Sequence, residues 1–109
     1  MIVEVGKLLN EVKTSIITTE KGDKTVLNNR IMIYRGKGRI TFVDIAAWGH
    51  VAEFIEKYFK QNEEIFIEGE LRNKQMILDG KPVQGYFILV NNARIVFGKN
   101  IKPKTEEEQ

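Results

Sequence analysis

Residues 40–60, ITFVDIAAWGHVAEFIEKYFK, contain the change of hydrophobic period that decides the fold. Up to Trp48 the side chains alternate between two faces, as they do along a β-strand. From Val51 the apolar residues recur at the i, i+3, i+4, i+7 and i+8 spacing of an amphipathic helix. This stretch therefore predicts a strand at about 39–48 that runs directly into a helix.

The segments on either side of this stretch have the composition of β-strands separated by short turns. Residues 2–19 are rich in Val, Ile and Thr, which strands favour. Turn residues at 20–24, at 36–38 and at Asp79-Gly80 delimit further strands at about 25–35, 65–78 and 83–96. Gly69, inside one of these strands, predicts a bulge or bend. The order β-β-β-α-β-β predicts an all-β protein with one helix and matches a five-stranded OB-fold barrel. Other small β folds are also consistent with this pattern.

The composition fits one soluble domain and excludes several kinds of site. The chain has 109 residues, of which 42% are hydrophobic and 29% charged, so we expect an ordered domain over 1–101 and a short flexible charged tail over 102–109. Cysteine is absent and histidine occurs once, which excludes thiolate zinc sites and histidine-rich metal sites. There is no apolar run of about 20 residues, and the first residues do not resemble a signal peptide. We therefore expect a cytoplasmic protein without a cofactor.

The predicted strand at 39–48 has an unusual second face. Its aliphatic side chains, such as Val43 and Ile45, share one face, whereas Phe42, Asp44 and Trp48 share the other. Exposed aromatic rings can stack on nucleic-acid bases, which contributes about 1–3 kcal/mol per base and tolerates any sequence. The alternative is that Phe42 and Trp48 cover a hydrophobic patch or a subunit contact.

Basic residues gather near this aromatic face. On the preceding strand Arg30 and Tyr34 share the parity that points away from the aliphatic Ile31 and Ile33, and further cations lie at the turn and on the strand at 65–78. The predicted phosphate contacts are Arg30, Arg35, Lys37, Arg39, Arg72 and Lys74. Met76 shares the parity of Arg72 and is expected either to pack against a base or to join the core. The alternative for the cations is a solvated edge that prevents aggregation.

No catalytic arrangement is recognisable in the sequence. His50 follows Gly49 at the start of the predicted helix, a position that favours a structural role over a catalytic one. Gly36-Lys37-Gly38 lacks the following glycine and Lys-Ser/Thr of a phosphate-binding loop. We therefore expect a binding protein and not an enzyme.

The segment 42–53 resembles the centre of bacterial and phage single-stranded DNA-binding proteins, which show an aromatic, a short β run, an aromatic-Gly pair and then Ala-Glu. The resemblance continues through 57–60 and 65–72, and residues 5–8 and 79–81 are similar to the opening strand and the late hairpin of that family. It implies an OB fold, sequence-tolerant binding of single strands in replication, recombination or repair, and a homo-oligomer. Most members of the family are homotetramers, and a dimer is the alternative.

The resemblance also implies roles for individual residues. Phe42 and Trp48 match the stacking aromatics of the third strand, and Met76 stands where a further stacking aromatic is expected. Tyr34 is the nearest match to an aromatic on the second strand, and Asn29 occupies a position that is often apolar in the family. The family's long Gly/Pro-rich linker and acidic apolar tip are not matched at 102–109, so we do not expect the tail to recruit partner proteins.

A different class of function is also consistent with these residues. The net charge is only +2, which leaves open an OB-fold interaction module whose aromatic face binds protein, such as a primosome-type adaptor with weak nucleic-acid binding.

Overall fold

The computed structural model describes residues 1–96, which form six strands and one helix. The strands are β1 (Ile2–Leu8), β2 (Thr14–Thr19), β3 (Gly22–Gly36), β4 (Arg39–Trp48), β5 (Glu64–Leu78) and β6 (Lys81–Ile95), and the helix is α1 (Gly49–Tyr58). The strand at 39–48 and the helix that follows it are confirmed. Residues 97–101 of the predicted domain and the predicted tail at 102–109 lie outside the described residues.

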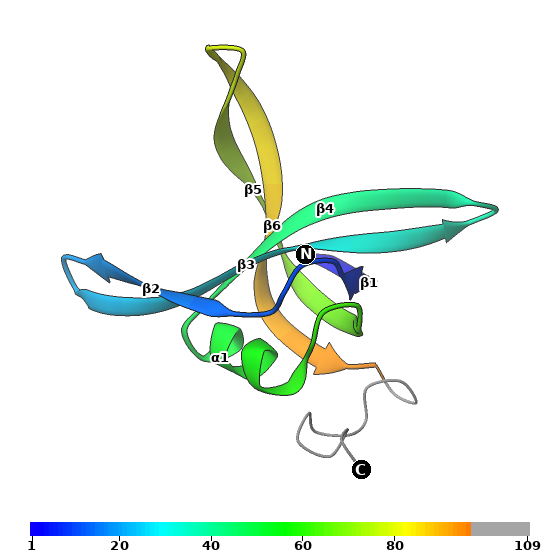
Figure 1. Ribbon diagram of the computed structural model, residues 1–109, viewed down its shortest axis with the longest axis horizontal. Coiled ribbons are helices and arrows are strands. Elements are labelled where there is room, and N and C mark those ends of the chain that lie inside the picture. Colours follow the sequence, from blue (N-terminus) through cyan, green and yellow to red (C-terminus); the bar gives the residue numbers. More distant parts are fainter. Residues whose placement is uncertain (97–109) are drawn as a thin grey trace.

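The strands form one sheet that closes into a barrel. Their order is β1-β5-β6-β4-β3-β2, and a short additional pairing between β1 and β3 completes the ring. β4 and β6 run parallel, and the other pairs are antiparallel. β2 pairs only with the first part of β3. The closed ring therefore has five strands, as predicted for the OB fold, and β2 extends β3 as an arm. Three hairpins, β2–β3, β3–β4 and β5–β6, project from the barrel in different directions (Figure 1).

The single strand expected over 2–19 is wrong, because the chain leaves the sheet between Leu8 and Thr14. At this break the Asn29 side chain bonds to the main chain of Asn10 twice: its Oδ1 accepts from the Asn10 N–H at 3.1 Å, and its Nδ2 donates to the Asn10 carbonyl at 3.1 Å. Asn29 is 6% exposed. Its amide thus replaces the bonds that a neighbouring strand would supply, and the chain can turn there without leaving these main-chain groups unpaired.

Aliphatic side chains from both halves of the sheet fill the barrel, and α1 closes one end. The fully buried group includes Leu8, Leu27, Ile31, Ile55, Phe59, Ile65 and Ile67. Ile55 and Phe59 occupy positions that the helical spacing predicted to be apolar. α1 is also fixed to β2, because the Glu56 carboxylate accepts hydrogen bonds from the Thr14 N–H and Oγ1 at 3.0 and 3.1 Å.

The predicted bulge at Gly69 is confirmed by a shift of register between β5 and β6 at Glu68/Gly69. A Cβ atom at Gly69 would collide with the Leu89 carbonyl of β6, so glycine is required for this close approach. β1 pairs with β5 only as far as Gly69, so beyond the bulge β5 pairs with β6 alone. The β5–β6 hairpin projects from the barrel (Figure 1).

Candidate nucleic-acid interface

The outward-facing surface of β3 and β4 carries the predicted aromatic residues. In the antiparallel register Met32 lies opposite Phe42, Arg30 opposite Asp44 and Val26 opposite Trp48, so these pairs share one side of the sheet. Phe42 is 55% exposed and Trp48 is 41% exposed, whereas Ile45 between them is buried. The predicted core face and open face of β4 are thereby confirmed at these positions, whereas Ala46 of the open face is buried and Thr41 of the core face is exposed.

Trp48 lies at the end of β4, where a groove opens between the barrel and the β2–β3 arm. The groove has a volume of about 700 Å³, and its lining includes Trp48, Arg30, Asp44, Lys74, Asn28 and Phe87. A second hollow, of about 510 Å³, joins Trp48 to Thr19, Glu20, Lys21 and Lys24 at the end of the β2–β3 hairpin. Trp48 therefore contributes to the lining of both hollows.

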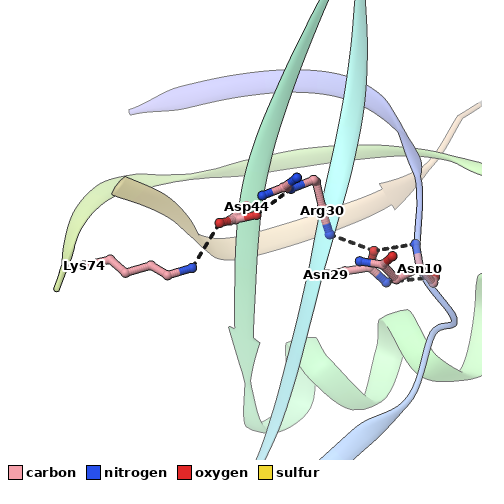
Figure 2. Close-up of polar contacts among 5 residues, drawn as sticks. All are labelled: Asn10, Asn29, Arg30, Asp44 and Lys74. Atoms are coloured by element: carbon pink, nitrogen blue, oxygen red, sulfur yellow. Dashed lines mark hydrogen bonds and ion pairs between the residues drawn. The ribbon is translucent and has the colours of Figure 1, made fainter. Parts of the chain in front are cut away.

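A carboxylate at the centre of this face holds two of the predicted phosphate-binding cations. Arg30 Nε lies 2.8 Å from Asp44 Oδ1, and Lys74 Nζ lies 3.0 Å from Asp44 Oδ2. Figure 2 shows the two cations approaching Asp44 from opposite sides, Arg30 from β3 and Lys74 from β5. The hydrogen bond from Arg30, and then the bond and charge of Lys74, lower the pKa of Asp44 despite an opposing effect of burial.

The sequence matches the model of the Single-strand binding protein family over residues 2–96. The chain belongs to this family. A single-stranded DNA-binding protein of Fusobacterium nucleatum is 29% identical over 65 residues, which cover 60% of this chain and 42% of that protein. The chain thus aligns with less than half of that relative's length.

Two solved structures share the fold of this family member. The mitochondrial single-stranded DNA-binding protein of S. cerevisiae aligns with a TM-score of 0.67 and 15% identity, covering 91% of this chain and 94% of the yeast chain. A domain of the same kind from Synechococcus aligns with a TM-score of 0.64 and 15% identity, covering 85% and 91%. At this identity the likeness establishes the OB fold of the chain.

The other predicted contacts of this family member do not form one continuous surface. Arg35 bonds to Glu4 of β1 at 3.1 Å, on the opposite side of β3 from Tyr34, because neighbouring side chains alternate. Arg72 pairs with Glu70 at 3.0 Å. Lys37 and Arg39 sit beside the tip of the β3–β4 hairpin and form no ion pair within residues 1–96. Tyr34, which is 66% exposed, belongs to the same hairpin.

Met76 lies on the β5–β6 arm and is half-buried. Its side chain packs over Gly85 of β6, where an added Cβ atom would collide with the Met76 sulfur. In the register Lys74 lies opposite Gly85 and Arg72 opposite Phe87, so the three predicted residues of β5 do share one side of the arm. Met76 is therefore neither a core residue nor fully free, and it stays a candidate contact.

Sequence reasoning missed Phe87 and Asn28 as lining residues of the groove. Asn28 shares the parity of Arg30, so alternation along the strand could have placed it on the outer face. Phe87 lies on β6, and no local pattern in the sequence shows that β6 pairs with β4. Within residues 1–96 no group of three acidic, histidine or cysteine side chains could hold a metal ion. α1, the one helix of the described residues 1–96, is not long and apolar enough to cross a membrane.

Proposed function

We propose that this protein binds single-stranded DNA without sequence preference, by stacking bases on Trp48 and Phe42 and by holding phosphates with the Lys and Arg residues around them. The observation that carries the proposal is the exposure of both rings on the outer face of β4, with the groove beside Trp48. The rings are six positions apart on one strand, about 20 Å at the usual strand rise. A flexible single strand can place bases against both rings, whereas a duplex keeps its bases paired and stacked.

Cations that form no ion pair within residues 1–96 lie at the two ends of such a path. Lys37 and Arg39 lie at the β3–β4 hairpin beyond Phe42, and Lys21 and Lys24 lie at the β2–β3 hairpin beside Trp48. Each phosphate that is neutralised releases counterions, so affinity for a single strand should fall with salt by a slope of about 0.7 per phosphate on logarithmic axes.

The test is a fluorescence titration. Trp48 is the single tryptophan of the chain, so its emission reports this site alone. Oligo-dT added at two salt concentrations should quench the emission at low salt and should bind less tightly at high salt. A hairpin duplex of equal charge is the control and should bind much more weakly. If the Trp48 emission does not change when oligo-dT is added at low salt, the stacking role is refuted.

We also propose that the protein works as a homo-oligomer in replication, recombination or repair, the setting implied by its family. Support comes from β1, whose Val3 and Val5 are 50% and 40% exposed on the outer side of the barrel. Only the last two residues of β1 pair with β3, so one main-chain edge of residues 2–5 has no strand pairing within residues 1–96 and is available to a second copy. Sedimentation with and without oligo-dT measures the assembly, and a monomer at micromolar concentration would refute it.

A protein-binding adaptor is the second candidate, and one observation favours it. Four of the six predicted cations, Arg30, Arg35, Arg72 and Lys74, are already paired with carboxylates, which reduces the positive charge available to DNA. An adaptor would retain neither single-stranded nor double-stranded DNA in a gel-shift experiment at low salt, whereas a DNA-binding protein would retain the single strand.

A further inference from the structure

The centre of the proposed DNA-binding face holds a negative charge that phosphate binding does not require. Asp44 lies between Phe42 and Ala46 along β4, and its side chain is 27% exposed. A lone carboxylate there would repel a DNA strand. Asp44 instead holds Arg30 and Lys74, one on each oxygen, at distances typical of charge-assisted hydrogen bonds. Two cations and one anion leave the trio with a formal charge of +1.

The donors that Asp44 occupies are those that a phosphate would use. Guanidinium and ammonium N–H groups bind carboxylate and phosphate oxygens with similar geometry. The Arg30 and Lys74 side chains are 53% and 41% exposed, so a strand lying in the groove can approach them. Ion pairs at this level of exposure are weak because water and salt screen them. An incoming phosphate can therefore displace the carboxylate, but it must compete with it.

We propose that Asp44 is an internal counter-ion that competes with DNA phosphates for Arg30 and Lys74 and thereby limits the affinity for single strands. The inference rests on the proposed binding function and adds a residue that tunes it. The same pairing keeps both cations extended over the groove, since they converge on Asp44 from β3 and β5 (Figure 2). A protein that covers single strands temporarily must also release them, and an internal competitor favours release.

The experiment measures oligo-dT affinity as a function of salt for the wild type and for Asp44→Asn. Asparagine keeps the shape and one acceptor oxygen but removes the charge. Asp44→Asn should bind about three- to thirty-fold more tightly at low salt, as expected from removing two exposed ion pairs. Its salt dependence should be steeper by up to about 1.4, which corresponds to two further phosphate contacts on a single strand.

The matched control is Asp79→Asn, at the tip of the β5–β6 hairpin, where the backbone φ of 53° suits asparagine. It removes the same charge away from the groove and should change the affinity little. Asp44→Thr is a second variant in case Asp44→Asn folds poorly, since threonine is favoured in strands.

Two outcomes overturn the inference and can be told apart. If the wild type binds and both folded Asp44 variants bind equally or less tightly, Asp44 positions the cations and does not compete with DNA. If neither the wild type nor the variants bind oligo-dT, the proposed function itself fails, and the role of Asp44 fails with it.

Discussion

The inner and outer faces of the β3–β4 sheet differ in chemistry, although the side chains of both faces alternate along the same two strands. The inner face is aliphatic, and Asn29 is the only buried polar side chain found within residues 1–96. The outer face carries exposed rings and a group of ion pairs around Asp44. Asn29 and Arg30 are neighbours in sequence, yet Asn29 fixes the course of the main chain on the inner side and Arg30 belongs to the proposed binding face on the outer side. The difference indicates that stability and binding can be changed separately.

The largest expected effect tests the inner face. Asn29→Ala removes two bonds to Asn10 and one to the Arg30 N–H. At a net value of about 1 kcal/mol per hydrogen bond, the free energy of unfolding should fall by about 3 kcal/mol. Urea denaturation measures this change. A stability equal to that of the wild type would mean that water replaces the amide and that Asn29 does not fix the break between β1 and β2.

At Trp48, on the outer face, a substitution should change DNA binding and not stability. Trp48→Ala should weaken oligo-dT binding by about 1–3 kcal/mol, because one stacking platform is lost, and should leave the unfolding free energy nearly unchanged. Anisotropy of a labelled oligonucleotide measures the affinity when tryptophan is absent. Trp48→Phe keeps an aromatic ring and is the matched control. An equal loss in both variants would contradict stacking as the mechanism.

The two cations at the tip of the β3–β4 hairpin, which form no ion pair within residues 1–96, should change the salt dependence of DNA binding. Replacing Lys37 and Arg39 together with Gln should make the salt slope shallower by up to about 1.4, the value for two phosphates on a single strand. The control is Lys13→Gln with Lys57→Gln, which removes the same charge from the β1–β2 connection and α1. An unchanged slope in the hairpin variant would mean that the DNA does not pass this hairpin. The DNA-binding part of the outer face would then be limited to the groove.

The smallest expected effect is the pH dependence that Asp44 contributes to stability. Its pKa is lowered in the folded protein, chiefly by the hydrogen bond from Arg30. The contribution is therefore fully present above the unfolded pKa of about 4 and is lost as the pH falls through the lower, folded pKa. Urea unfolding of the wild type and of Asp44→Asn should differ at pH 7, and the difference should shrink below about pH 4. A difference that grows with acid would contradict the direction of the pKa shift.

The local sequence was sufficient for most elements of the fold. The change of period at Trp48 located the end of β4 and the start of α1, and Asp79-Gly80 located the β5–β6 turn. Alternation along β4 identified Phe42 and Trp48 as members of the exposed face. These features depend on neighbours a few residues away, so propensity, turn chemistry and side-chain parity contain the necessary information.

The tertiary structure decided where the chain breaks between β1 and β2 and which charges of the outer face form ion pairs. The break depends on Asn29, which is 19 residues from Asn10, and the ion pairs of Asp44 join β4 to β3 and β5. No local pattern shows that one carboxylate meets two cations from different strands, because the pairing follows from barrel closure and register. The sequence by itself therefore determined which residue types face outward, while the closed barrel determined which of those charges neutralise one another.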